Sequence, residues 1–341
     1  MSDMFRSGLG FGVGYDSRAT VREMAASMAD AERAGFSMGF FSETFFTNRD
    51  SVSALSAFSL STERMALGAT QVVRLRSPLV MAQTMATLDE MSGGRIVLVV
   101  GAATDKHAAR NGIAPMKPPQ VLREYIHSIR LLLTGEKITY RGRFVTLEDV
   151  GLNFTPVRSE IPIWVAGASP LGLRIAGQLG DGILLDAGTS PEYSANAIAR
   201  IREAREEAGR SMDDFSVAQL VNTSIEATRA EACEAMRWEV ASKFKYASTG
   251  RAKIVVGETA IPADSPDRLS AIYQSQGEQA LLDAIDDDFV AALTASGTID
   301  DVEARVQQYR DAGVNFPILR ATAKHQIPTL LAAGPRLSGR L

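Results

Sequence analysis

Short apolar runs alternate with helical segments along almost the whole of this 341-residue chain. This alternation constrains the fold most, because strands separated by helices pair in parallel and carry the helices on their faces. Residues 95–100 read Arg-Ile-Val-Leu-Val-Val, a continuous apolar run typical of a strand buried on both faces. Eight strands are predicted, at 8–15, 39–42, 65–70, 95–100, 163–166, 183–186, 215–221 and 315–320.

Helix signals fill the intervals between these runs. Thr20-x-x-Glu23 is the pattern of a capping box, and Pro78 stands where a helix would begin. Eight strands alternating with helices predict a (β/α)8 (TIM) barrel. The alternative is a doubly wound open sheet, in which a glycine-rich loop follows the first strand. The glycines at 8, 10, 12 and 14 alternate within the first predicted strand, which favours close packing in a barrel over a dinucleotide-binding loop.

The domain organisation follows from the spacing of the runs. We expect one barrel domain over residues 1–341, because no linker or repeat divides the chain. Some 90 residues separate the last two predicted strands, far more than one helix needs. A mostly helical insertion is therefore expected at about 225–295. A small β excursion is expected at 137–147, turning at Gly142.

Composition excludes several classes of function. The net charge is −4 and no basic block is present, so nucleic acid is not expected as a partner. Cys233 is the only cysteine, no apolar run approaches the length of a membrane span, and the first residues lack the apolar core of a signal peptide. These features predict a cytoplasmic protein. Three histidines without an HExxH pattern predict no metal site.

Polar or small residues follow several predicted strands, where barrels carry their active sites. Glu43 follows the second strand and could accept a hydrogen bond or act as a base, or simply cap a helix. Gly101 and Ala102 follow the fourth strand, where small residues let a flat ligand approach the backbone. Asp105 and His107 come next and could reach such a ligand; a surface ion pair with Lys106 and a structural histidine are the alternatives.

Two further segments are candidate anion or cofactor sites. Residues 167–172 read Gly-Ala-Ser-Pro-Leu-Gly and join the fifth strand to a helix. Phosphate could bind the free N–H groups there, helped by the Ser169 hydroxyl. Routine capping by Ser169, with Pro170 in the first turn, is the alternative, and both can hold together. After the third strand, Arg76 could meet an anionic group or only solvent.

The order of several segments makes the chain resemble the bacterial-luciferase-like superfamily of flavin and deazaflavin barrels. The likeness is strongest to the branch that contains coenzyme F420-dependent methylenetetrahydromethanopterin reductase. It covers nearly the whole chain. The matching segments are Ser42 to Asp50, Leu67 to Val73, Arg76-Ser77-Pro78, Asp105 to Ala108, Asn153 to Val157, Ile161 to Val165, Gly180 to Leu185 and Ala295 to Val302.

The resemblance implies a cofactor ring at the carboxyl ends of the barrel strands. It also implies a non-proline cis peptide at the end of the third strand, which maps to Thr70–Gln71 and would back the central ring. The cofactor phosphate would lie at Ala168, Ser169, Leu171 and Gly172. The implied reaction is hydride transfer between the deazaflavin C5 and a substrate carbon, with the protein supplying orientation and electrostatics.

The chain also departs from this branch. The reductase branch has Asp-His where this chain has Glu43-Thr44, and it carries a glutamate in the first strand where this chain has Gly12. The glutamate that related sugar-phosphate dehydrogenases carry after the fourth strand maps near Thr104. These departures argue against the methylene-pterin and sugar-phosphate reactions.

The sequence therefore predicts an F420-dependent oxidoreductase acting on a small organic substrate. An FMN-dependent monooxygenase that activates O2 is the alternative within enzymes, and a cofactor-binding barrel without turnover is the alternative outside them. The resemblance further implies a homodimer. The assigned catalytic candidates are Glu43, Asp105 and His107, and the cofactor-binding candidates are Thr70, Gln71, Gly101, Ala102, Ala168, Ser169, Leu171, Gly172 and Arg76.

Overall fold

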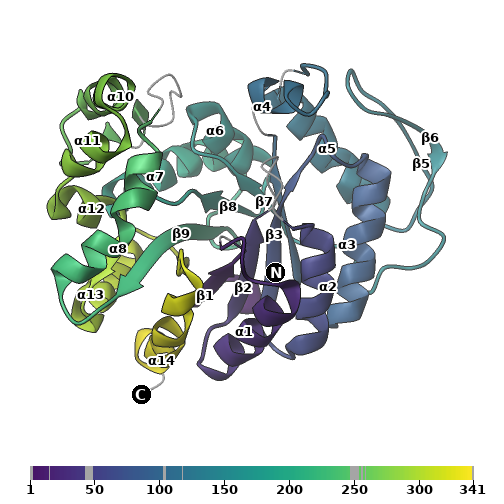
Figure 1. Ribbon diagram of the computed structural model, residues 1–341. Helices are drawn as coiled ribbons and strands as arrows, with labels where there is room; N and C mark the ends of the chain where they lie inside the picture. Colours follow the sequence, from purple (N-terminus) through teal and green to yellow (C-terminus); the bar gives the residue numbers. More distant parts are fainter. Residues whose placement is uncertain are drawn as a thin grey trace.

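Eight parallel strands close into a barrel in the computed structural model (Figure 1). The model describes residues 3–14, 16–42, 49–102, 105–116, 118–245, 253–254, 256–257 and 259–339. Each barrel strand pairs with the next, and the pairs β8–β9, β9–β11 and β11–β1 complete the ring. The strands are β1 (Gly10–Val13), β2 (Met38–Ser42), β3 (Ala66–Val72), β4 (Ile96–Gly101), β7 (Ile163–Ala166), β8 (Gly182–Leu185), β9 (Ser216–Ile225) and β11 (Phe316–Arg320).

The predicted TIM barrel is thus confirmed, and the open doubly wound sheet is not formed. Helices connect the strands and surround the ring (Figure 1). In chain order these helices are α1 (Val21–Arg33), α2 (Ser51–Ser61), α3 (Pro78–Ser92), α4 (Asp105–Ala109), α5 (Pro118–Leu133), α6 (Pro170–Leu179), α7 (Pro191–Glu207), α13 (Ile299–Asp311) and α14 (Ile327–Leu337).

Local sequence signals set the beginnings of these helices. The capping box predicted before α1 is present: Thr20 Oγ1 accepts from the Glu23 N–H at 3.2 Å, and Glu23 Oε2 accepts from the Thr20 N–H at 2.8 Å. Pro78 opens α3, and the Ser77 side chain caps it. These caps satisfy backbone donors that have no partner within the helix, so they determine where each helix starts.

Close packing explains the glycines of β1, as the sequence predicted. A side-chain carbon added at Gly10 would lie 2.6 Å from Ile318 Cγ1 of the neighbouring strand β11. The strand is shorter than the predicted 8–15, and Tyr15 lies outside the described residues. Strand β9 is longer than predicted, because Thr223 to Ile225 pair with an additional short strand, β10 (Ala295–Gly297).

The barrel interior has its own apolar core. Trp164 and Phe316 are fully buried there, with ring centroids 5.8 Å apart. The 3-10 helix η1 (Asp3–Phe5) closes the amino-terminal end, with Phe5 buried in the same core and its carbonyl accepting from the Ser216 hydroxyl. A larger core fills the space between the sheet and the surrounding helices. The interior is therefore filled below its carboxyl end.

Two excursions extend from the barrel. The hairpin β5 (Ile138–Arg141) and β6 (Thr146–Val150) is the predicted small β excursion and projects on the side away from α10 and α11 (Figure 1). Between β9 and β10 lie α8 (Arg229–Ser242), α10 (Ser265–Gln276), α11 (Glu278–Asp283) and α12 (Asp287–Leu293). These helices share a separate apolar core that includes Met236 and Leu269. A last 3-10 helix, η2 (Lys324–Gln326), precedes α14.

Within the described residues, every helix falls short of the length or hydropathy that crossing a membrane would require.

Candidate functional site

A layer of interior positions lies above the apolar core, at the carboxyl ends of the strands. Side chains at alternate strand positions point into a barrel. In β11, Phe316 and Ile318 belong to the interior core, so Arg320 is the next interior position. The same alternation along the other strands gives the remaining members of this layer. They are Gly12, Thr70, Gly101, Ala166, Asp186, Asn222 and Arg320.

One side of this layer consists of small residues. A side-chain carbon added at Gly101 would lie 3.6 Å from Thr70 Cγ2 and 3.6 Å from Ala166 Cβ, which is ordinary contact distance. Thr70 and Ala166 are partly exposed. We call Thr70, Gly101 and Ala166 the small-residue floor. Since no bulky side chain rises from these three positions, a planar ring could lie against this part of the mouth.

The expected cis peptide is wrong. The described residues contain no cis bond, so Thr70–Gln71 is trans. Strand β3 keeps regular parallel pairing through this step, with Thr70 opposite Val99 and Gln71 opposite Val100. A trans link costs nothing and fits this uninterrupted ladder, whereas a non-proline cis link would cost about 3 kcal/mol.

Gln71 points away from the barrel interior, toward α2. Its side chain is fully buried; Nε2 donates to Ser51 Oγ at 2.9 Å, and Oε1 accepts from Arg76 Nη1 at 2.9 Å. Arg76 also donates from Nη2 to Asp50 Oδ2 at 2.8 Å. The two predicted cofactor contacts therefore join the loop after β3 to the start of α2.

Asp105 is held by Arg74, a partner that was not predicted from the sequence. Arg74 Nη1 donates to Asp105 Oδ1 at 2.6 Å, and Arg74 Nε donates to the Ala102 carbonyl at 3.0 Å. The Arg74 side chain is buried while that of Asp105 is 40% exposed. This pair ties the loop after β3 to the loop after β4.

The other two catalytic candidates are Glu43 and His107. Glu43 lies outside the described residues. The backbone of His107 is helical, within α4, and its side chain lies outside the described part of the chain. The geometry of both roles stays a prediction.

The loop after β7 has the predicted capping geometry. Ser169 is the N-cap of α6, and its hydroxyl accepts from the Gly172 N–H at 3.1 Å. The Ala168 carbonyl accepts from the Tyr193 hydroxyl at 2.7 Å, which anchors the loop to α7. Leu171 is 46% exposed. Pro170 has no N–H, and the Gly172 and Leu173 N–H groups donate to Ser169, so the N–H groups of Ser169 and Leu171 are the donors that this cap leaves at the rim of the barrel.

Charged and amide side chains line the opposite side of the mouth, and none of them was predicted from the sequence. Arg320 is buried; its Nη2 donates to Glu239 Oε1 at 3.0 Å, and its Nε donates to Asn222 Oδ1. Asn222 Nδ2 lies 3.4 Å from the same Glu239 oxygen. Lys243, which caps α8, donates from Nζ to the Ala187 carbonyl at 3.2 Å. We call these groups, with Asp186, the polar wall: Asp186, Asn222, Glu239, Lys243 and Arg320.

Desolvation makes Lys243 the electrostatically unusual member of this wall. Its surroundings lower the pKa of the ammonium to about 8; the Glu239 carboxylate opposes this lowering and Arg320 reinforces it. A lysine with such a pKa exchanges its proton near neutral pH, unlike a solvated lysine. The sequence offered one signal for the wall: Arg320 ends an apolar strand at an interior position. Glu239 and Lys243 could not be placed without knowing where α8 packs.

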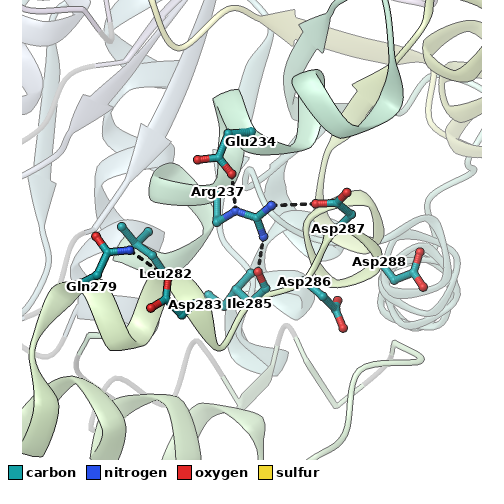
Figure 2. A pocket seen from close by; sticks show the side chains of 9 residues that line it. All are labelled: Glu234, Arg237, Gln279, Leu282, Asp283, Ile285, Asp286, Asp287 and Asp288. Atoms are coloured by element: carbon teal, nitrogen blue, oxygen red, sulfur yellow. Dashed lines mark hydrogen bonds and ion pairs between the residues drawn. The ribbon is translucent and has the colours of Figure 1, made fainter.

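A surface hollow of about 600 Å³ lies on the helical insertion, away from this face of α8 (Figure 2). Arg237 stands at its centre, donating to Glu234, Asp287 and the Ile285 carbonyl. Arg237 points from α8 nearly opposite to Glu239, since two residues span about 200° of a helix. The Arg237 guanidinium is already paired, and most of the other residues that line the hollow are acidic. We therefore do not assign the active site to this hollow.

Comparison with known proteins gives the family. A family model described as luciferase-like monooxygenase matches residues 6–315. The 5,10-methylenetetrahydromethanopterin reductase of Archaeoglobus fulgidus is 28% identical over 310 residues, which cover 89% of this chain and 91% of the relative. The F420-dependent glucose-6-phosphate dehydrogenase of Nakamurella multipartita is 25% identical over 334 residues, with 94% and 92% covered.

A solved structure shows the same fold. The coenzyme F420-dependent tetrahydromethanopterin reductase from Methanopyrus kandleri superposes with a TM-score of 0.85 at 22% identity, covering 96% of this chain and 97% of that one. The family match extends from before β1 to the start of β11, and so includes all the strands that carry the small-residue floor. The chain belongs to the luciferase-like monooxygenase family.

Proposed function

We propose that this protein is an F420-dependent oxidoreductase that transfers a hydride between the deazaflavin C5 and a small organic substrate. The observation that carries the proposal is the small-residue floor, where Thr70 and Ala166 are partly exposed, with the polar wall on the opposite strands. The two relatives above are named as a reductase and as an F420-dependent dehydrogenase. Both names support redox chemistry and one supports this cofactor.

The residues present fit a planar cofactor with a phosphate. Thr70, Gly101 and Ala102 would lie against the ring, together with the backbone of Gln71. Ala168, Ser169, Leu171 and Gly172 form the loop that would hold the phosphate, through the N–H groups that the Ser169 cap leaves at the start of α6. Arg76 is partly exposed beside this mouth and would act mainly by fixing the loop after β3, since two of its donors are taken. When bound, the deazaflavin supplies the hydride-transfer chemistry.

The catalytic assignments are proposals of the same kind. Glu43 would supply a carboxylate at the end of β2, and His107 an imidazole on α4. Asp105 would act chiefly by position, since its carboxylate is paired with Arg74.

The second candidate is an FMN-dependent monooxygenase, which the family description favours. A barrel that binds a cofactor without turnover is a further outcome of the test. We also propose a cytoplasmic homodimer with a small-molecule substrate.

Titration with the two cofactors separates these functions. Binding of F420 but not FMN, with loss of the oxidised deazaflavin absorbance when substrate is added, would support the proposal. Oxygen consumption with reduced FMN would support the monooxygenase. Binding without turnover of any substrate would support the third outcome, and binding of neither cofactor would refute all three.

The substitution Glu43→Gln tests the catalytic assignment. We expect it to reduce turnover more than F420 affinity, because the amide keeps the shape of the side chain but not its charge. Unchanged turnover would remove Glu43 from the mechanism.

A further inference from the structure

The end of α8 brings one lysine to the rim of the barrel mouth. The methylene groups of Lys243 lie against Gly188, where an added side-chain carbon would be 2.9 Å from Lys243 Cε. Gly188 has a φ of +79°, in the region that favours glycine, so the close approach and the turn both depend on this residue. The ammonium therefore has a defined position beside the loop that follows β8.

The described residues use one of the three donors of this ammonium. Nζ donates to the Ala187 carbonyl at 3.2 Å, and an ammonium has three N–H groups. Two charged groups act on it from the surrounding elements: Glu239 from α8 and Arg320 from β11. Glu239 is already shared with Arg320 and Asn222. Donors thus remain for a group that enters the mouth.

Burial and the nearby charges bring the pKa of Lys243 close to neutral pH. Desolvation and Arg320 favour the neutral amine, and Glu239 favours the ammonium, with a resulting pKa of about 8. General acids and bases work best when their pKa lies near the working pH.

We propose that Lys243 gives a proton to the substrate oxygen while the neighbouring carbon receives the hydride, so that the substrate pair is a ketone or aldehyde and its alcohol. This inference rests on the proposed function. Arg320 and Glu239 are positioning residues, because they hold the wall and set its charge without contacting the substrate.

The step balances as follows. A hydride passes from the reduced deazaflavin to the carbonyl carbon, and the electron pair of the C=O π bond moves to the oxygen. That oxygen takes a proton from the Lys243 ammonium, which becomes a neutral amine. One proton passes from the cofactor to solvent and Lys243 recovers one, so the sum is carbonyl compound plus reduced deazaflavin to alcohol plus oxidised deazaflavin. Oxidation of the alcohol is the reverse.

This chemistry distinguishes carbonyl compounds from iminium-type substrates. An iminium carbon that receives a hydride becomes a neutral amine and needs no proton, whereas a carbonyl oxygen would be left as an alkoxide. A proton donor at the mouth is thus useful for a carbonyl substrate and dispensable for an iminium.

The test uses two substitutions and one control. Lys243→Met removes the donor. Lys243→Arg keeps the positive charge but cannot release a proton at neutral pH. Lys137→Met removes an exposed lysine paired with Asp149 on the β5–β6 hairpin, far from the wall. Acetone, cyclohexanone and acetophenone are the probes, with reduced F420 as the hydride source, and F420 affinity is measured for each variant by fluorescence.

We expect both Lys243 variants to bind F420 within about twofold of the wild type and to lose about 100-fold in kcat, with less than threefold change in KM. Lys137→Met should keep the wild-type rate. Independently of turnover, the rate of acetylation of Lys243 by acetic anhydride, followed by peptide mass spectrometry, should rise with a midpoint near pH 8.

Three results would overturn the inference. These are a labelling midpoint above pH 10, wild-type turnover in either Lys243 variant, or F420 binding by the wild type without reduction of any probe ketone. The last leaves the proposed function intact. Failure of the wild type to bind F420 would refute the proposed function and the inference with it.

Discussion

The substitution Glu239→Gln should destabilise the protein, because it leaves a buried guanidinium without its carboxylate. The Arg320 side chain is 8% exposed, and its Nη2 lies 3.0 Å from Glu239 Oε1. Glutamine keeps an oxygen for this hydrogen bond but removes the negative charge. Arg320 then retains Asn222 as a partner, which is neutral.

The structure sets the size of this effect. Breaking a fully buried ion pair by removing one partner costs about 3–5 kcal/mol. Glu239 is 24% exposed, so water can replace part of the lost interaction. A hydrogen bond to a charged group contributes about 1.5–3 kcal/mol. We therefore expect Glu239→Gln to lower the free energy of unfolding by about 2 kcal/mol.

Equilibrium unfolding in urea measures this change, with Glu303→Gln as the matched control. Glu303 accepts from Arg336 Nε at 3.0 Å, but its side chain is 45% exposed, so its loss should cost about 0.5 kcal/mol or less. Combining Glu239→Gln with Arg320→Met should cost less than the sum of the single changes, because both single changes break the same ion pair. An additive double variant, or a Glu239→Gln protein as stable as the wild type, would refute the reasoning.

Three further changes test the positions around the mouth. Tyr193→Phe removes the donor to the Ala168 carbonyl and should cost about 1 kcal/mol in urea unfolding and weaken F420 binding, measured by fluorescence titration; equal affinity would show that the loop needs no anchor. Gly101→Ala should keep F420 binding and Gly101→Val should lose it, because one added carbon fits at 3.6 Å from its neighbours and a branched side chain would cover the floor; equal binding by both variants would contradict this. Burial raises the pKa of Glu32, but hydrogen bonds from three backbone N–H groups outweigh this effect, so that the pKa lies below its usual value. The stability from Glu32 is thus present above about pH 4 and lost as the pH falls through its folded pKa. Glu32→Gln should cost about 2 kcal/mol at pH 7 and less near pH 3, measured by unfolding at both pH values; an equal cost at both would refute this origin.

The barrel could be predicted from the sequence because its signals are local. The apolar run at 95–100 predicts a strand buried on both faces from six consecutive residues. The alternating glycines of β1 predict close packing against the neighbouring strand in the same way. Strand β7 was predicted at its observed bounds, Ile163–Ala166. The extension of β9 to Ile225 was missed because it depends on β10, a three-residue strand with no periodic signal.

The site was predicted less completely, for a physical reason. Residues that directly follow a strand, such as Gly101 and Ser169, can be found by position, since every strand end lies on one rim. Their partners depend on tertiary packing: Asp105 was predicted as a site residue, with an ion pair to Lys106 as the alternative, and the structure pairs it with Arg74, 31 positions away. Glu239 and Lys243 sit on a helix of the insertion, and nothing in their local sequence indicates that this helix end reaches the barrel.

The structure gives a physical setting for one departure from the reductase branch, the glycine at position 12 beside Arg320. The resemblance places a glutamate at the position of Gly12, and this chain has no side chain there. A carbon added at Gly12 would lie 3.1 Å from Arg320 Cβ, so the stem of an arginine packs against the bare backbone. An acid at that position would crowd Arg320 and compete with Glu239 for its guanidinium. In this chain the mouth therefore carries no carboxylate on β1, and the Arg320 cation on β11 is paired with Glu239 of α8. The proposed proton donor, Lys243, lies at the end of the same helix.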